Sequence, residues 1–328
     1  METLEEAELC FPHLLNISCK RQLQHRGPTV SVYVILSCLS LLTVTLNLLV
    51  IISISHFRQL HTSTNLLLLS LAVSDFLVGL LLMPGRIILM TGCWFLGSVI
   101  CGLFFYASFF LTSASVGTMV LISVDRYVAI CDPLSYSTKV THQRVKISVS
   151  VCWACSLFYN GVILHVFLKN PDANNSCYGE CLVVIDVITG AVDIAVTFVG
   201  PIAVIVVLYL KVFVVAVSQA RAMRSHITAV TVQGLGTVTA KKSVRKAARI
   251  LGIVVVVFVI CFCPYFYPAL ADTSPGIAFK FFAVWLLYGN SCINPIIYAS
   301  FYPWFRRSIK LIVTLQILRP DSRDTHIM

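Results

Sequence analysis

The sequence has little charge. Only 12% of its 328 residues are Asp, Glu, Lys or Arg, whereas 58% are hydrophobic, and the mean hydropathy is +0.89. Chains that fold in water carry about 25% charged residues, so this composition excludes an ordinary soluble domain. Lipid is therefore the expected solvent for most of the chain.

Acidic residues are the scarcer of the charged types. There are 14 of them against 24 Lys and Arg, and none lies between Asp193 and Asp272. Lys and Arg stay on the cytoplasmic side of a membrane, and anionic inner-leaflet lipid attracts them. Their positions predict an outer amino terminus, an inner carboxyl terminus and contact with lipid rather than nucleic acid. The basic residues that flank the apolar runs include Arg58, Lys139, Arg144, Lys146, Lys241, Lys242, Arg245, Lys246, Arg306 and Arg307.

Long apolar runs are abundant. A hydrocarbon core about 30 Å thick needs roughly 20 helical residues per crossing, and unpaired backbone in lipid excludes open sheets and loops. The runs lack the alternation of β-barrel strands. They predict an all-α membrane protein, a seven-transmembrane helix bundle with an extracellular segment at 1–30, a membrane domain at 31–301 and a short amphipathic eighth helix in the tail at 302–328. The runs cover residues 31–55, 65–90, 98–131, 146–168, 183–215, 246–270 and 278–301.

Thirteen cysteines are present, but their spacing does not suggest a metal site, and most lie in the apolar runs, where free Cys behaves as a small apolar residue. The outer cysteines face the oxidising side. We expect a Cys101–Cys181 disulfide first and Cys19–Cys177 second, with Cys10 unassigned. Glycosylation sequons begin at Asn16 and Asn174, both in segments that the topology places outside.

Ionisable residues within the apolar runs are candidates for function, because each costs several kcal/mol in lipid unless it is paired or hydrated. Asp75 lies in the middle of the second run and Arg86 near its outer end. Asp186 and Asp193 lie in the fifth run, and Asp186 is closer to water, as expected for a solvated helix start.

Short motifs, one or two per run, give the chain a resemblance to the rhodopsin-like G-protein-coupled receptors. These motifs are Asn47, Leu71-Ala72-Val73-Ser74-Asp75, Asp125-Arg126-Tyr127, Trp153, Pro201 with Tyr209, Cys261-Phe262-Cys263-Pro264 and Asn294-Pro295-Ile296-Ile297-Tyr298. The run from Asn290 to Phe305 resembles more narrowly the trace amine-associated receptors. That resemblance implies a plasma-membrane receptor, not an enzyme, that senses amines in olfactory neuron cilia and raises cyclic AMP through a stimulatory G protein of the Gs or olfactory type.

The resemblance also implies roles for individual residues. G-protein coupling and activation would involve Asp125, Arg126, Tyr127, Leu134, Tyr209, Asn294, Pro295 and Tyr298. A sodium ion would bind among Asp75, Ser115, Asn290, Ser291 and Asn294, although a hydrated polar network without an ion is the alternative.

The amine site departs from the usual pattern of the family. Ser108 stands at the position of the third-helix aspartate that holds the amine in the family. A hydroxyl can hydrogen-bond an ammonium group but cannot neutralise its charge. Asp193, eight residues before Pro201, resembles the relocated aspartate of a subset abundant in fishes. With a single carboxylate well placed, a monoamine is the expected ligand. The predicted ligand-binding residues are Asp193, Ser108, Thr112, Thr197, Phe262, Tyr265, Phe266, Trp285 and Tyr288.

Alternatives remain open for this site. Asp193 could be structural, reaching the outer interface or pairing with Arg86, and the ligand would then not be an amine. Arg86 could hold an aspartate, face water or favour a ligand that carries an acid. A transporter, channel or membrane enzyme would need repeats, broken helices or a metal cluster. An opsin would need a lysine where Tyr288 stands, and Lys280 lies too far out.

Overall fold

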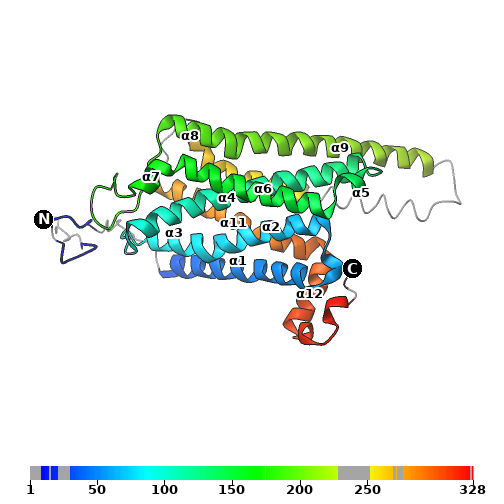
Figure 1. Ribbon diagram of the computed structural model, residues 1–328, viewed down its shortest axis with the longest axis horizontal. Coiled ribbons are helices and arrows are strands. Elements are labelled where there is room, and N and C mark those ends of the chain that lie inside the picture. Colours follow the sequence, from blue (N-terminus) through cyan, green and yellow to red (C-terminus); the bar gives the residue numbers. More distant parts are fainter. Residues whose placement is uncertain are drawn as a thin grey trace.

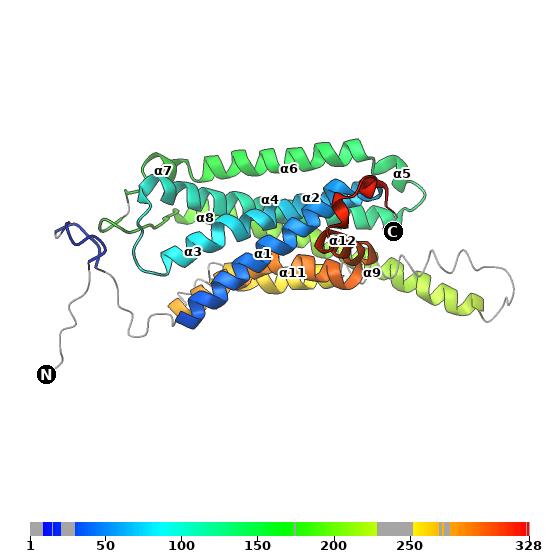
Figure 2. The ribbon, with the colours of Figure 1, turned by 90° about the horizontal axis from the view of Figure 1, so that it is seen from below.

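The computed structural model describes residues 9–14, 16–20, 30–173, 175–227, 252–268, 271, 276–325 and 327. Long helices run side by side along the longest axis of the molecule, with the amino-terminal segment at one end and the carboxyl terminus near the other (Figures 1 and 2). In the described residues, β-structure is limited to two isolated bridges, Leu9 with Lys20 and Ser18 with Tyr178. The prediction of an all-α fold is confirmed.

Six helices in the described part of the chain are long and apolar enough to cross a membrane, and a shorter apolar helix, Gly252–Pro268, lies within the predicted sixth run. Residues 246–251 and 269–270 of that run are outside the described residues. The spanning segments are α1 (Val30–His56), α2 with η2 and α3 (Ser63–Leu89), α4 (Gly97–Cys131), α6 (His142–Ile163), α8 with η3 and α9 (Val187–Ile227), and α11 (Ile277–Phe301). Short helices α5 (Tyr136–Lys139) and α7 (His165–Lys169) flank α6.

The fifth span starts later than predicted. Residues 183 to 186 are not helical, and α8 (Val187–Ile194) begins after Asp186, whose carboxylate accepts a hydrogen bond of 2.9 Å from the backbone N–H of Thr189. Hydrogen bonds from Thr189 lower the pKa of the exposed Asp186 carboxyl. Asp186 is therefore an exposed N-cap. The apolar run alone could not reveal this, because Val183 and Val184 extend the run beyond the first residue of the helix.

In the described residues, two π-helical turns interrupt the spans. The turn η2 (Val78–Leu82) separates α2 (Ser63–Leu77) from α3 (Met83–Leu89), and η3 (Ala195–Val199) separates α8 from α9 (Gly200–Ile227). A π turn contains an extra residue and rotates the following side chains, and such turns are frequent at functional sites. They lie next to the two segments that carry Arg86 and Asp193.

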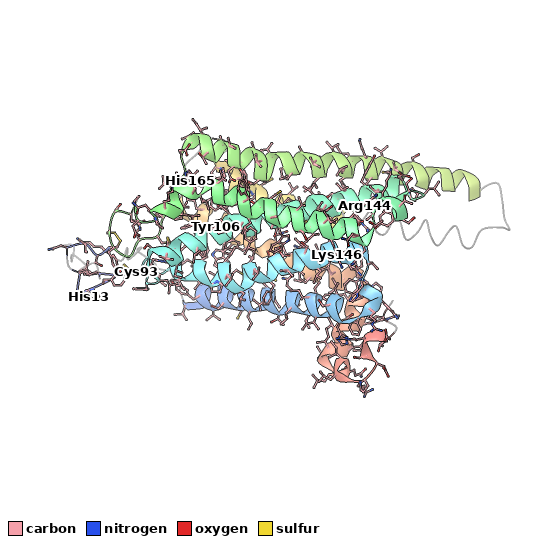
Figure 3. The ribbon with its side chains drawn as sticks, in the orientation of Figure 1. His13, Cys93, Tyr106, Arg144, Lys146 and His165 are labelled. Carbon is pink, nitrogen blue, oxygen red and sulfur yellow. A yellow bond between two sulfur atoms is a disulfide. The ribbon has the colours of Figure 1, made fainter. Side chains whose placement is uncertain are left out.

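The tail begins with α12 (Pro303–Val313), which packs against α1 and α11. Trp304 and Phe305 are buried on one face, while Arg306 and Arg307 are exposed on the other. This confirms the amphipathic eighth helix. Arg144 and Lys146 lie toward the same end of the bundle as α12, opposite His13 and Cys93 (Figures 1 and 3).

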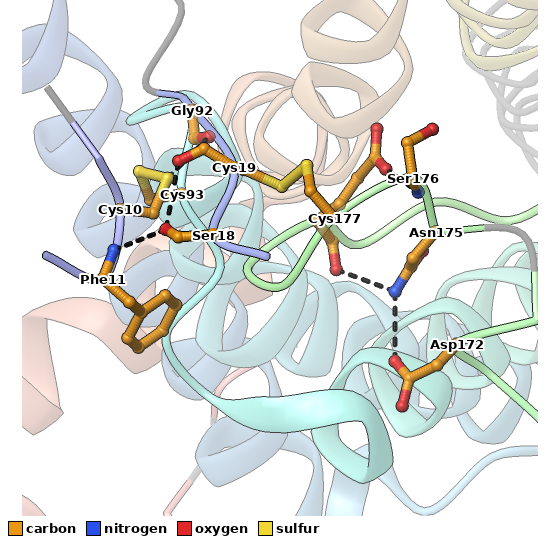
Figure 4. The surroundings of a disulfide bond; sticks show 11 residues. Cys10, Phe11, Ser18, Cys19, Gly92, Cys93, Asp172, Asn175, Ser176 and Cys177 are labelled. Atoms are coloured by element: carbon orange, nitrogen blue, oxygen red, sulfur yellow. Dashed lines mark hydrogen bonds between the residues drawn. A yellow bond between two sulfur atoms is a disulfide. The ribbon is translucent and has the colours of Figure 1, made fainter. Parts of the chain in front are cut away.

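Three disulfides gather at the end of the bundle with the amino-terminal segment. Cys101–Cys181 and Cys19–Cys177 form as expected, and Cys10 pairs with Cys93, a partner that the sequence did not indicate. Figure 4 shows Cys10 and Cys19 side by side, with the Ser18 hydroxyl accepting a 2.8 Å hydrogen bond from the backbone of Phe11. The amino-terminal segment is thus held to two different loops.

Of the two predicted glycosylation sites, one lies within the described residues. Asn16 is exposed beside this disulfide cluster, as a glycosylated residue must be. Asn174 lies outside the described residues. One group of possible metal ligands occurs in the described chain, Cys19, Cys177 and Glu180, but both of its sulfurs are in the disulfide and offer no thiolate.

Candidate functional site

A cavity of about 270 Å³ lies toward the end of the bundle with the disulfides. Its walls combine an apolar and aromatic majority with a few polar groups, which is typical of a small-molecule site. They come from α3, α4, the segment after Cys181, α8, η3, Gly252–Pro268 and α11. The lining residues are Arg86, Phe105, Ser108, Phe109, Thr112, Ser113, Val183, Ile185, Gly190, Asp193, Ile194, Thr197, Tyr265, Phe266, Leu287 and Tyr288.

Asp193 is the one carboxylate among these lining residues. Its side chain is 7% exposed, and its Oδ1 accepts a hydrogen bond of 3.3 Å from the hydroxyl of Tyr159 on α6. In the described part of the chain it forms no ion pair. A carboxylate that is buried with a single weak partner is electrostatically unsatisfied, so the cavity favours a cationic group at this point.

Hydroxyl groups line the same cavity as this carboxylate. Thr197 donates its hydroxyl to the backbone oxygen of Asp193 at 2.7 Å, and Ser108 donates to that of Phe104 at 2.9 Å. Both donors are therefore used within their own helices, which leaves the hydroxyl oxygens as acceptors. Such acceptors suit the N–H groups of a ligand.

Two of the nine predicted ligand-binding residues do not line the cavity. Phe262 is buried beneath it and packs on Phe258, with ring centroids 4.1 Å apart. Trp285 is buried too, with its ring centroid 6.2 Å from that of Tyr288. The helical spacing that suggested them does not distinguish a cavity wall from the adjoining core.

The segment after Cys181 forms part of the cavity wall. Val183 and Ile185 follow Cys181, whose disulfide to Cys101 attaches this segment to the first turns of α4. Sequence reasoning did not place either residue at the site, and it also missed Tyr159. A lone tyrosine on the fourth span carries no spacing signal that would connect it to Asp193.

A polar network lies in the middle of the bundle. Asp75 is 1% exposed, and its Oδ2 accepts a 2.8 Å hydrogen bond from Nδ2 of Asn294. Ser115 donates to Ser74 at 2.9 Å. In the described residues, the side-chain oxygens Oδ1 of Asp75 and of Asn290 are buried without a hydrogen-bond partner. Ser291, the residue after Asn290, is also buried. Unpartnered oxygens of this type fit a hard cation.

Near the carboxyl-terminal end of α4, Asp125 is 3% exposed and surrounded by donors. Nε of Arg126 donates to its Oδ2 at 2.8 Å, and the hydroxyl of Tyr136 donates to its Oδ1 at 2.8 Å. Thr64 donates to the same carboxylate at 3.1 Å, and Arg126 also contacts Thr64. Arg126 is therefore held by Asp125 on its own helix α4 and by Thr64 on α2, while Tyr136 on α5 holds the carboxylate of Asp125. Arg126 also lines an open cleft, with His61 and His142 among others.

The other residues expected to act in signalling surround this region. Tyr209 approaches Gly252 so closely that a Cβ there would overlap its hydroxyl, so glycine is required at the contact between α9 and the following helix. Tyr298 is buried, with its hydroxyl unpartnered in the described residues, and Pro295 lies inside α11. Leu134 is 94% exposed, and Nζ of Lys211 lies 5.9 Å from the ring centroid of Tyr127.

Comparison with known proteins matches residues 46–298 to the model of the 7 transmembrane receptor (rhodopsin family). Trace amine-associated receptor 13c of Danio rerio is 38% identical over 98% of this chain and 97% of its own length. Trace amine-associated receptor 1 of Mus musculus is 35% identical over 94% and 96%, and receptor 7f of the same species 36% over 98% and 92%. This chain belongs to the trace amine-associated receptors.

Membership of this family decides the coarse function. The protein is a multi-pass plasma-membrane receptor of the rhodopsin class, not an enzyme, with a ligand and a heterotrimeric G protein as its partners. The cavity and the Asp125–Arg126 pair lie toward opposite ends of α4. A receptor of this class needs its ligand site and its G-protein site at opposite ends of the bundle, and this separation is consistent with that.

Proposed function

We propose that this receptor binds the ammonium group of a monoamine through Asp193 and raises cyclic AMP through a stimulatory G protein of the Gs or olfactory type. The observation that carries the proposal is the buried, ion-unpaired carboxylate of Asp193 in the wall of the outer cavity. Ion pairs strengthen as the effective dielectric falls, so an ammonium gains most at such a position. The names of the relatives support an amine as the ligand.

The position of Asp193 supports assignment to the fish-type subset whose amine-binding aspartate lies in the fifth helix. Ser108, on the facing helix, offers a hydroxyl oxygen but no charge. Tyr265 and Tyr288 add aromatic faces that attract cations. One carboxylate in the lining favours a single ammonium over a diamine, since a diamine would leave its second charge unpaired.

The topology follows from the same proposal. The amino terminus, with its disulfides and Asn16, lies outside the cell, and α12 with Arg306 and Arg307 lies at the inner leaflet. The charge distribution supports this orientation because Lys and Arg are retained in the cytoplasm. The plasma membrane of olfactory neuron cilia is the proposed location.

A panel of amines tests the proposed function directly. In cells that express the wild-type chain, we expect at least one primary or tertiary monoamine to raise cyclic AMP several-fold over its own effect in vector-transfected cells. Diamines of matched chain length should be at least tenfold less potent. Surface staining of the receptor is the control, and a surface-expressed receptor silent to the whole panel would favour a ligand that is not an amine.

The polar network around Asp75 supports a second proposal, a sodium ion held by Asp75, Ser115, Asn290, Ser291 and Asn294. The fit rests on the two unpartnered buried oxygens of Asp75 and Asn290. A bound cation would offset the cost of burying a mid-membrane carboxylate. These residues would stabilise the inactive packing of α2, α4 and α11 around the ion.

Sodium should therefore reduce agonist potency. Replacing external sodium chloride with N-methylglucamine chloride is expected to raise amine potency by roughly fivefold, within the usual range of allosteric coupling. The variant Asp75→Asn should show no such dependence in the same cyclic-AMP assay. An equal sodium response in wild type and variant would assign the network to hydration alone.

A further inference from the structure

The cavity that contains Asp193 has a second charged group in its wall, the guanidinium of Arg86 on α3. The other lining residues are neutral. Arg86 follows the π turn η2, and Asp193 precedes the π turn η3, so an irregular turn adjoins each of the two charged segments. The cavity wall thus carries one positive and one negative side chain, and its net charge is zero.

Arg86 has no polar partner among the described residues. Among the described residues its guanidinium donates no hydrogen bond and forms no ion pair, with Asp193 or with any other acid. Its Nε is fully buried and has no partner. Buried donors left unpaired are costly, so a ligand that pairs them gains the difference. Of the alternatives left open for this site, an internal ion pair between Asp193 and Arg86 is therefore not formed in the described residues.

A single ligand in the cavity would meet both charged side chains. Arg86 and Asp193 line the same cavity, and Tyr265 lines it with them. A plain amine would satisfy Asp193 but would add a second cation near an unpaired guanidinium. A plain acid would satisfy Arg86 and meet Asp193 with a like charge. A molecule that carries both groups pairs each with its complement.

We propose that the preferred ligand is amphoteric: an amino acid, or an ω-amino analogue, whose ammonium pairs with Asp193 and whose carboxylate pairs with Arg86. This inference rests on the proposed role of Asp193 as the ammonium partner. Guanidinium binds carboxylate through two parallel N–H···O bonds, a geometry that a neutral acceptor does not satisfy. The cavity of about 270 Å³ suits a molecule of this size.

Matched ligand pairs test the inference on the wild-type receptor. The first set is 2-phenylethylamine, phenylalanine and phenylalanine methyl ester, and the second is hexylamine and 6-aminohexanoic acid. In a cyclic-AMP assay, the acid of at least one set should be tenfold or more as potent as its amine. For the aromatic set, the ester should resemble the amine, because it keeps the size of the acid without the charge.

Receptor variants locate the effect. Arg86→Gln should remove the advantage of the acid while leaving the plain amine equally or more potent, since the repelling cation is gone. Arg86→Lys should keep part of the advantage. Lys280→Gln, which removes an exposed cation at the start of α11 outside the cavity, is the matched control and should leave every ratio unchanged. Surface staining corrects each value for expression.

The outcomes separate the inference from the proposed function. If amines activate the receptor but acids are equal or weaker in both sets, the inference is overturned and the amine function stands. If neither amines nor amino acids act on surface-expressed wild type, the proposed function fails and the inference fails with it. If Arg86→Gln does not reach the surface, the ligand pairs on wild type and on Arg86→Lys still decide.

Discussion

Asp193→Asn abolishes the amine response at physiological ligand concentrations: this is the largest effect that we expect. The change keeps the shape of the side chain and removes its charge. An ammonium would then lie in a low-dielectric cavity without an anion, at a cost of about 3–5 kcal/mol for a broken buried pair. Since 1.4 kcal/mol is a factor of ten, amine potency should fall by roughly a hundredfold or more in a cyclic-AMP assay.

Asp186→Asn is the matched control for this prediction. Asp186 is an exposed N-cap of the same helix, outside the cavity, so its loss should cost a little helix stability and change amine potency less than threefold. Tyr159→Phe separates the binding role from a structural one. If Asp193 served only to pair with Tyr159, both variants would lower surface expression equally and leave potency intact among the receptors that remain.

The second large effect concerns the disulfide Cys101–Cys181. It attaches the segment with Val183 and Ile185 to α4 and spans 80 residues of chain. Native disulfides typically contribute about 2–5 kcal/mol. Cys101→Ser should therefore reduce surface receptor several-fold, lower the thermal midpoint of the detergent-solubilised protein and weaken amine binding, because the cover of the cavity is released.

Cys10→Ser should have a smaller effect on the same measurements. The amino-terminal segment would still be held by Cys19–Cys177 after Cys10–Cys93 is lost. Cys38→Ser, at an exposed free cysteine of α1, is the control and should match wild type. An equal loss in Cys10→Ser and Cys101→Ser would contradict the view that the cavity cover is the critical attachment.

Much of this architecture was predictable because a membrane imposes simple rules on sequence. Runs of apolar residues predicted the spans closely, and the flanking Arg144 and Lys146 lie toward one end of the bundle. Asp193 and Thr197 line the same cavity, as their spacing of one helical turn suggested. These features depend on composition and local periodicity, which the sequence displays directly.

Other features depend on packing between distant segments. The π turns change the helical register near Arg86 and Asp193, and no residue type in the sequence predicts them. Cys93 follows the second span with nothing to connect it to Cys10 until the fold brings the two together. Phe262 has the helical spacing of the cavity residues but is packed in the core against Phe258. Spacing along a helix identifies the face that points into the bundle, and it does not tell whether a cavity or other side chains lie opposite that face.

The three disulfides are all at one end of the molecule, and they join the amino-terminal segment, the loop at Cys93, α4 and the segment before α8. None of them reaches Gly252–Pro268 or α11, whose cysteines Cys261, Cys263 and Cys292 are free. The covalent restraints therefore hold one half of the bundle at this end. A shift of Gly252–Pro268 or α11 relative to that half would strain no disulfide, so we expect these two segments to be the ones that move when a ligand binds.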